Sequence, residues 1–410
     1  MNKMRWIAAS LVVAAGLTLV FPASPSLARQ KGEPRWATAA VAPKPLPNSA
    51  LKGLDWLAEH QLDSGGWGQG EESSQMGGGD QMAATANVAD TCIASLAMLR
   101  SGSTPHSGTY AKNLARGVEF VLAQVEKADE ESLYVTDVRG TRVQSKIGTY
   151  VDTFLASMLL SEVKGQMDSK SANERVERAL NKVIAKIENH QSESGGFDNQ
   201  GWAPVLSQSI AAKGLNRARQ AGADVSDKAL DRAQGYAEGQ IDEGGKVRTE
   251  GAAGVDLYAT SSNVATMQET ANTYAAEKVA YEQKLKAAKN EDERRVLRDK
   301  LGRIQAQEQA NKDSKKRLID RISDPGFVEG FGSNGGEEFL SYMNISEALV
   351  VEGGQQWIDW DKAMMANLSR IQNDDGSWSG HHCITGKTFC TSAAILVLTA
   401  DRAPVPASKS

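Results

Sequence analysis

A seven-residue pattern, Gln-x-x-x-Gly-x-aromatic, recurs along this chain with unchanged spacing. Each complete copy follows an amphipathic stretch of helical period and precedes a stretch rich in small residues. A supersecondary unit repeated in this way predicts a repeat architecture. A fourth stretch, which begins at Gln240, keeps the glycines but has Lys246 in place of the aromatic residue. The three complete copies are Gln61 with Gly65 and Trp67, Gln191 with Gly195 and Phe197, and Gln372 with Gly376 and Trp378.

The residue types of this pattern indicate a structural role. Glycine tolerates the positive φ angle at which many helices end. A glutamine amide can bond backbone groups that are freed at a helix end. The aromatic ring can pack over the neighbouring unit. We therefore interpret the pattern as a helix-ending turn that is fastened to the next unit.

Two kinds of predicted helix alternate from residue 49 onward. The outer kind carries charge on one face, with predicted helices near 49–61, 109–126, 170–190, 226–240 and 356–372. The inner kind has small or apolar residues all round, near 83–101, 148–164, 203–221, 336–352 and 388–400 and from Gly254. A helix without a polar face is crowded on every side. The chain is therefore predicted to be an all-α, (α/α)6 toroid over residues 49–403, with six inner and six outer helices.

Residues 264–322 interrupt this alternation with a long, highly charged stretch that has few glycines or prolines. Apolar residues recur in it at three- and four-residue spacing, with a break near Lys289 and Asn290. This pattern predicts an antiparallel, coiled-coil-like helical hairpin that extends the fourth inner and fifth outer helices. The hairpin is either a solvated spacer or an arm that docks a partner.

The N-terminal stretch has the features of a signal peptide. Lys3 and Arg5 precede an apolar run, and small residues lead to a predicted cleavage site after Ala28. Residues 1–28 are thus the predicted signal peptide, 29–48 a Pro/Ala-rich linker and 404–410 a disordered tail. We expect a periplasmic or extracellular protein with no stable membrane span after cleavage.

The net charge indicates which partners to expect, and the cysteines indicate which disulfides are possible. The net charge of −5 becomes −5 − 2 = −7 without Lys3 and Arg5, and no basic stripe with interleaved aromatics suggests nucleic acid. In an exported protein Cys383 and Cys390 are candidates for a disulfide. A Cys92–Cys390 bridge remains open if the first and last units touch.

Helix pairs joined by Gln-x-x-x-Gly-x-Trp turns resemble the squalene–hopene cyclase and protein prenyltransferase β-subunit superfamily. The resemblance covers most of residues 49–400. It implies an α/α toroid with a central cavity that opens at one rim.

The cyclases of that superfamily protonate an alkene with the middle Asp of an Asp-x-Asp-Asp-Thr motif. The matching stretch here ends in Ala89-Asp90-Thr91, so the donor position is Ala89, and a second copy has Val151 before Asp152. Neither copy can supply the acid, which argues against cyclisation. We expect Asp90 and Asp152 to lie at the cavity rim and to cap inner helices.

The prenyltransferases of the same superfamily hold zinc with an Asp-x-Cys pair and a downstream histidine. By that resemblance Asp90, Cys92 and His382 are candidate zinc ligands. The basic cluster that would bind an isoprenoid diphosphate is missing from the sequence around them.

Three functions follow. The first is non-catalytic binding of a protein partner or an apolar ligand, through the cavity rim or the hairpin. The second is a zinc-dependent prenyl-type transferase that uses Asp90, Cys92 and His382. The third is a glycan-active toroid enzyme, with turn carboxylates near aromatic sugar platforms. Its candidates are Asp63, Asp198, Asp374 and Asp375 with Trp67, Trp202 and Trp378.

Overall fold

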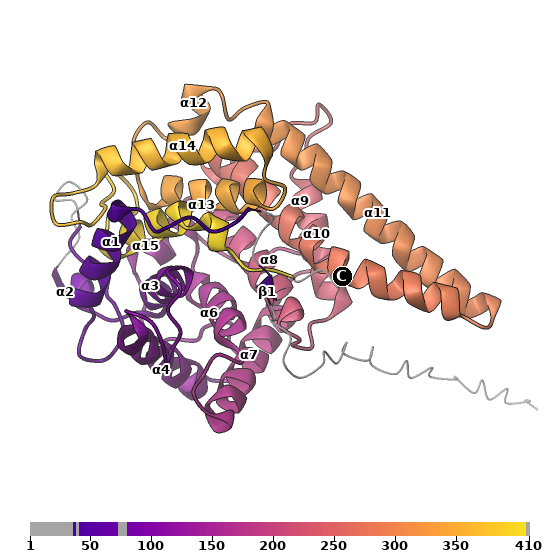
Figure 1. The fold of residues 1–410 in the computed structure, drawn as a ribbon, viewed down its shortest axis with the longest axis horizontal. Coiled ribbons are helices and arrows are strands. Elements are labelled where there is room, and N and C mark those ends of the chain that lie inside the picture. Colours follow the sequence, from indigo (N-terminus) through magenta and orange to yellow (C-terminus); the bar gives the residue numbers. More distant parts are fainter. Residues whose placement is uncertain (1–35, 38–40, 73–79, 407–410) are drawn as a thin grey trace, which may run out of the picture. The chain divides into compact units, whose positions relative to one another are not determined.

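The small-residue stretches form helices that are covered on nearly every side. In the computed structural model, every residue of α6 and α13 is buried. Each inner helix packs against the next one in the chain, and the last, α15, packs against the first, α3, which closes a ring (Figure 1). The inner helices are α3 (Val88–Arg100), α6 (Val151–Val163), α8 (Val205–Gln220), α10 (Asp256–Ala287), α13 (Gly336–Val350) and α15 (Lys387–Leu398).

The amphipathic stretches form the outer layer and turn their apolar faces to this ring. The structure describes residues 36–37, 41–72 and 80–406, so the predicted signal peptide lies outside it. Within these ranges, six inner helices are surrounded by six outer ones, which confirms the predicted all-α toroid. No helix in the described ranges has the length and apolar composition needed to cross a membrane. The outer helices are α1 (Asn48–Glu59), α4 (Ala111–Lys127), α7 (Lys170–His190), α9 (Asp227–Gly239), α11 (Glu291–Ile319) and α14 (Gly354–Ile371).

The glutamine of each complete turn bonds two backbone carbonyls. One belongs to the glycine of its own turn, and the other lies at the start of the next outer helix around the ring. The last turn bonds α1 in this way, so the same device also closes the ring. The bonds run from Gln61 to Gly65 (2.7 Å) and Asn113 (2.8 Å), from Gln191 to Gly195 (3.3 Å) and Ala229 (3.2 Å), and from Gln372 to Gly376 (2.7 Å) and Ser49 (2.9 Å).

The tryptophans of the turns fasten the two helices of their own pair. The Trp67 amide donates to the Thr91 hydroxyl (2.9 Å), and its indole Nε1 donates to the Leu57 carbonyl (2.8 Å). Trp378 repeats this arrangement with Thr391 and Leu368, both at 2.9 Å. Each ring is fully buried, so the repeated pattern is part of the packing.

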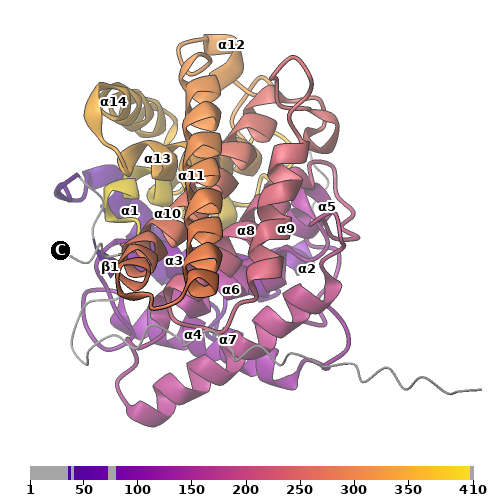
Figure 2. The same ribbon diagram turned by 90° about the vertical axis from the view of Figure 1, so that its right-hand side faces the viewer.

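The charged insertion is a helical hairpin, as predicted. Helix α10 continues beyond the ring, the chain reverses after Ala287, and α11 returns along it to become an outer helix (Figures 1 and 2). The seam is polar in places. Lys278 pairs with Glu308 at 2.9 Å, and Asn311 donates to Gln268 at 3.2 Å.

Residues before and after the toroid are tied to each other. Strand β1 (Trp36–Ala37) pairs antiparallel with β2 (Val405–Pro406). The Lys44 amide donates to Asp401 Oδ2 at 2.7 Å. Residues 405–406 therefore differ from the disordered tail predicted for 404–410, because backbone hydrogen bonds hold them to the N-terminal arm. The remaining short helices are α2 (Asp80–Ala83), α5 (Arg142–Ile147), α12 (Pro325–Val328), η2 (Glu250–Ala252) and η3 (Ala400–Arg402).

The C-terminal halves of the inner helices meet in a buried ionic network. Arg100 of α3 bonds Glu162 of α6 at 2.9 Å and Glu347 of α13 at 3.1 Å. Lys213 of α8 reaches Glu347 at 2.6 Å, and Arg217 bonds Glu269 at 2.8 Å. Because α13 does not neighbour α3 or α8 in the ring, these side chains cross its interior. This end of the ring is therefore filled by the protein's own side chains.

Candidate functional site

The first turns of the inner helices gather four buried carboxyl groups. Asp90 lies in the first turn of α3, Asp152 in that of α6, and Glu337 and Glu338 in that of α13. Glu337 and Asp90 both lie near Cys390 of α15. Burial raises the pKa of this thiol, and the charges of Glu337 and Asp90 raise it further. We call these four residues the rim acids.

Hydrogen bonds hold Asp90 and Asp152 in place. The side-chain oxygen of Asn87 caps α3 by accepting a hydrogen bond from the Asp90 backbone amide (2.9 Å). The side-chain amide of Asn87 donates to Asp90 Oδ2 (2.7 Å). The Asp152 carboxylate accepts hydrogen bonds from the Ala89 backbone amide (2.9 Å) and from the Gln144 side-chain amide (2.7 Å). Asp152 thus caps the neighbouring helix α3. The expectation that Asp90 caps a helix is wrong, because Asn87 already occupies that position.

Burial shifts these acids toward their protonated forms. It raises the pKa of Asp90 to about 7, although the bond from Asn87 opposes the shift. Burial and then the charge of Glu338 raise the pKa of Glu337 to about 8. The pKa values of Asp152 and Glu338 are raised by burial as well. A carboxyl group that keeps its proton near neutral pH can act as a general acid.

Glu338 is surrounded by hydrogen-bond donors. Its Oε1 accepts the Tyr258 hydroxyl and the Phe331 amide (3.1 Å). Its Oε2 lies 3.5 Å from His382 Nε2, and that nitrogen donates to the Ser333 carbonyl (2.7 Å). A bond to a carbonyl requires hydrogen on Nε2. Nδ1 of a neutral His382 is therefore an acceptor.

Several polar atoms of this cluster are buried without a hydrogen bond. A buried polar atom without a partner costs free energy, and most are satisfied. Four such atoms of the described residues belong to this cluster. Within the part of the chain that the structure describes, they are Asp90 Oδ1, Glu337 Oε1, Glu338 Oε2 and His382 Nδ1.

Aromatic side chains border the same cluster. The Phe331 ring, 54% exposed, lies between Trp202 and His382, with centroid distances of 5.1 and 5.2 Å. Trp202 is half-buried and also contacts Tyr258. Three tryptophans were expected to serve as sugar platforms. The prediction is wrong for Trp67 and Trp378, because both rings are fully buried.

The structure does not form the predicted disulfide or zinc site. Cys92, Cys383 and Cys390 are all free thiols, and Cys390 Sγ donates to the Ile384 carbonyl at 3.4 Å. No group of three His, Cys, Asp or Glu side chains among the described residues can hold a metal ion. His382 faces Glu338, whereas Cys92 lies inside α3 with a pKa that burial raises well above its usual value. Asp90, Cys92 and His382 therefore do not fit a zinc site, because the fold does not bring the three side chains together.

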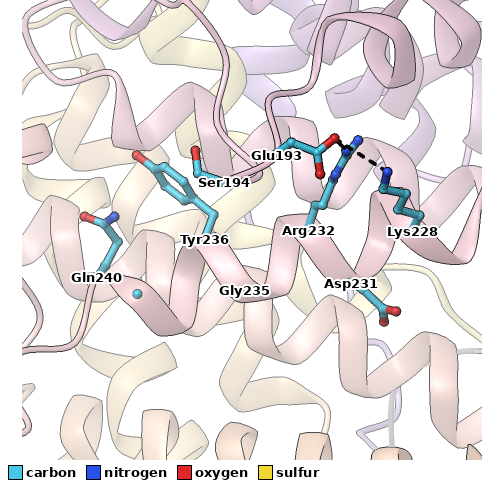
Figure 3. Close-up of a pocket in the computed structure, with 9 residues that line it drawn as sticks. Glu193, Ser194, Lys228, Asp231, Arg232, Gly235, Tyr236 and Gln240 are labelled. Carbon is cyan, nitrogen blue, oxygen red and sulfur yellow. Dashed lines mark hydrogen bonds and ion pairs between the residues drawn. The ribbon is translucent and has the colours of Figure 1, made fainter.

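A concave region lies on the outside of the ring (Figure 3). The turn at Glu193 and Ser194 and one face of α9 line this groove of about 830 Å³. Its charges are compensated, since Glu193 pairs with Arg232 and, at 3.5 Å, with Lys228. The rim acids do not line it, so the groove is separate from the candidate acid–base site.

The sequence interpretation missed Glu337, Glu338 and Tyr258. Gly335-Gly336-Glu337-Glu338 opens an inner helix, at the position where Asp90 and Asp152 lie in their own helices. Comparing the first turns of the repeats would have identified this pair. The turn acids Asp63, Asp198, Asp374 and Asp375 do not belong to the buried cluster.

Comparisons with known proteins address the fold. No family model matches the chain, and no curated protein matches it. Among solved structures it is similar to "a novel alpha-amylase from Clostridium perfringens", with a TM-score of 0.52 and 10% sequence identity. The match covers 88% of this chain and 99% of that chain. The chain has an α/α toroid fold. At this identity the likeness extends to the fold alone.

Proposed function

We propose that this protein is an exported glycan-active enzyme that cleaves glycosidic bonds by acid–base catalysis at the rim acids. The observation that carries the proposal is the set of unpartnered carboxyl oxygens on Asp90, Glu337 and Glu338 beside an exposed aromatic group. Sugar hydroxyls suit such oxygens, and sugar rings stack on aromatic faces. The similar α-amylase supports the idea that a toroid can carry glycan chemistry.

The two glutamates divide the chemistry between them. Glu337 holds its proton at neutral pH, and its Oε2 already accepts the Ile384 amide (3.2 Å). Its Oε1 is thus available to protonate the departing glycosidic oxygen. Burial raises the pKa of Glu338, but the hydrogen bonds from Tyr258 and the Phe331 amide oppose that rise and favour the carboxylate. Glu338 acts as the base or nucleophile, as glycoside hydrolysis by paired carboxyl groups requires.

The test is release of reducing ends from a panel of α- and β-linked glycans by the full exported chain. Glu338→Gln and Glu337→Gln should each lower turnover by about 10²–10⁴-fold without loss of the folded state, since each removes one proton-transfer group. Glu126→Gln, which removes a carboxylate from the outer helix α4, is the matched control. The absence of turnover on every glycan, or equal rates for Glu338→Gln and the wild type, would reject the proposal.

A second candidate is non-catalytic binding of an apolar ligand or a protein partner, in a member of the squalene cyclase and prenyltransferase β-subunit superfamily. The paired bonds made by Gln61, Gln191 and Gln372 favour that kinship, and Ala89 at the donor position fits a non-catalytic member. Native mass spectrometry of the exported protein tests it. A co-purified apolar adduct supports it, and a bare mass with glycan turnover rejects it.

A further inference from the structure

A short basic segment borders the rim acids. Arg139, Arg142 and Lys146 follow one another at spacings of three and four residues, in the turn before α5 and in α5 itself. Arg142 pairs with Glu72 at 3.3 Å. Arg139 and Lys146, by contrast, lie beside aromatic rings.

Lys146 lies between the rim acids and an aromatic ring. Its Nζ is 5.8 Å from the centroid of the half-buried Trp202. Burial raises the pKa values of Glu337 and Cys383, and the charge of Lys146 partly offsets both rises, so this cation faces the cluster. No carboxylate of the described residues lies within ion-pair distance of Lys146.

Arg139 repeats this arrangement beside Asp152. Its guanidinium lies 3.4 Å from the centroid of Tyr134, and Tyr134 packs against Tyr150 at 4.9 Å. Burial raises the pKa of Asp152, and the charge of Arg139 partly offsets this. Arg139 donates to the Val138 carbonyl (3.1 Å), and in the described ranges it has no carboxylate partner.

From this geometry we infer that the glycan bound at the rim is acidic, with carboxylate or sulfate groups that pair with Lys146 and Arg139. The inference rests on the proposed function and adds its substrate class. A neutral glycan can bind through the aromatic rings and the unpartnered oxygens and needs no cation. Cations that lie over those rings, without a carboxylate of the protein, provide a partner for an anionic substituent of a stacked sugar.

Binding to a catalytically disabled chain tests the inference apart from catalysis. Full-length Glu338→Gln protein would be titrated with three matched pairs of oligosaccharides: oligogalacturonate and its methyl ester, oligoglucuronate and the neutral glucan, and a sulfated galactan and its desulfated form. We expect at least one acidic member to bind about tenfold more tightly than its neutral partner, as one charged hydrogen bond provides. The pair that responds distinguishes carboxylate from sulfate.

Variants that each remove one positive charge test which cations cause the preference for acidic oligosaccharides. Lys146→Met and Arg139→Met should each reduce the acidic preference several-fold. Lys228→Met, which removes a cation from the outer groove, should not alter it. The inference is wrong if no acidic glycan is preferred or if all three variants behave alike. A preference without any glycan turnover would instead reject the catalytic proposal and retain an acidic-glycan binding site.

Discussion

At the scale of single residues, the free energy of the rim acids depends on protonation. In water Asp and Glu titrate near 3.9 and 4.3, but burial raises the pKa of Asp90 to about 7 and that of Glu337 to about 8. The folded state therefore binds these protons more tightly than the unfolded chain. Their stabilising contribution is fully present below about pH 4 and is lost as the pH rises through 7 and 8.

This linkage predicts a pH-dependent stability that two substitutions remove. Between about pH 4 and 7 the unfolding free energy should fall by up to about 1.4 kcal/mol per pH unit for each group. In the double variant Asp90→Asn, Glu337→Gln the decline should be much shallower, because neither side chain titrates. Thermal unfolding followed across this pH range measures it.

Glu126→Gln is the control for that measurement. Bonding to Arg175 lowers the pKa of Glu126, so this residue contributes stability that is lost as the pH falls. Its removal should leave the decline toward pH 8 unchanged. Equal slopes for the wild type and the double variant would contradict the assigned protonation.

At the scale of elements, the repeated turn joins three helices. Its aromatic residue ties an outer helix to its inner partner, and its glutamine ties both to the next outer helix. The Gly65, Gly195 and Gly376 backbones have φ angles of 88°, 84° and 88°, a region where other residues are strained. This explains why the spacing between glutamine and glycine is the same in each copy.

Loss of one such glutamine should weaken the closure of the ring. Gln372→Ala removes two hydrogen bonds and leaves the Ser49 and Gly376 carbonyls without that donor, at a cost of about 1–3 kcal/mol. Gln240→Ala, in the incomplete copy, should change stability by less than about 0.5 kcal/mol. Urea unfolding of both variants provides the comparison. Equal losses would mean that the turn bonds are not responsible.

The hairpin should be separable from the toroid. Replacing residues 275–304 with a short glycine-containing turn keeps the bonds from Asn311 to Gln268 and from Ser314 to Asn263 (2.6 Å) that attach α11 to the ring. We expect cooperative unfolding with a midpoint within a few degrees of the wild type. Circular dichroism during heating measures this. Loss of cooperative unfolding would show that the outer part of the hairpin supports the ring.

At the scale of the whole molecule, the two ends of the ring interior differ. The end with the ionic network contains three cations, Arg100, Lys213 and Arg217, and three glutamates, Glu162, Glu269 and Glu347. Burial alone would raise the pKa of Glu347, but the charges of Lys213, Arg217 and Arg100 outweigh it. The pKa of Glu347 is therefore well below its usual value. The opposite end holds the four rim acids, whose pKa values burial raises instead.

Breaking the network should destabilise the whole ring. Glu347→Gln leaves Lys213 and Arg217 without one buried anion, which typically costs about 3–5 kcal/mol. The control is Glu59→Gln at the end of the outer helix α1, an exposed residue with no ion-pair partner among the described residues, with an expected cost below about 0.5 kcal/mol. Chemical denaturation of both variants gives the two values. A small loss for Glu347→Gln would mean that the cations find other partners or water.

Local chemistry explains which features could be predicted from the sequence. The helical periods, the glycine-ended turns and the break at Asn290 are properties of neighbouring residues. They were sufficient for the alternation of helices, the toroid class and the hairpin. Asn290 does cap α11 by accepting the Glu293 amide at 2.8 Å.

The assembly of distant side chains into one site is a property of the folded ring. Ring closure places first turns of α3, α6 and α13 together, although their acids are separated by up to 248 positions, from Asp90 to Glu338 (338 − 90). It also separates Cys92 from His382 and brings His382 to Glu338 instead. Whether an acid is charged depends on burial and on partners from other helices, and neither is encoded in its immediate neighbours.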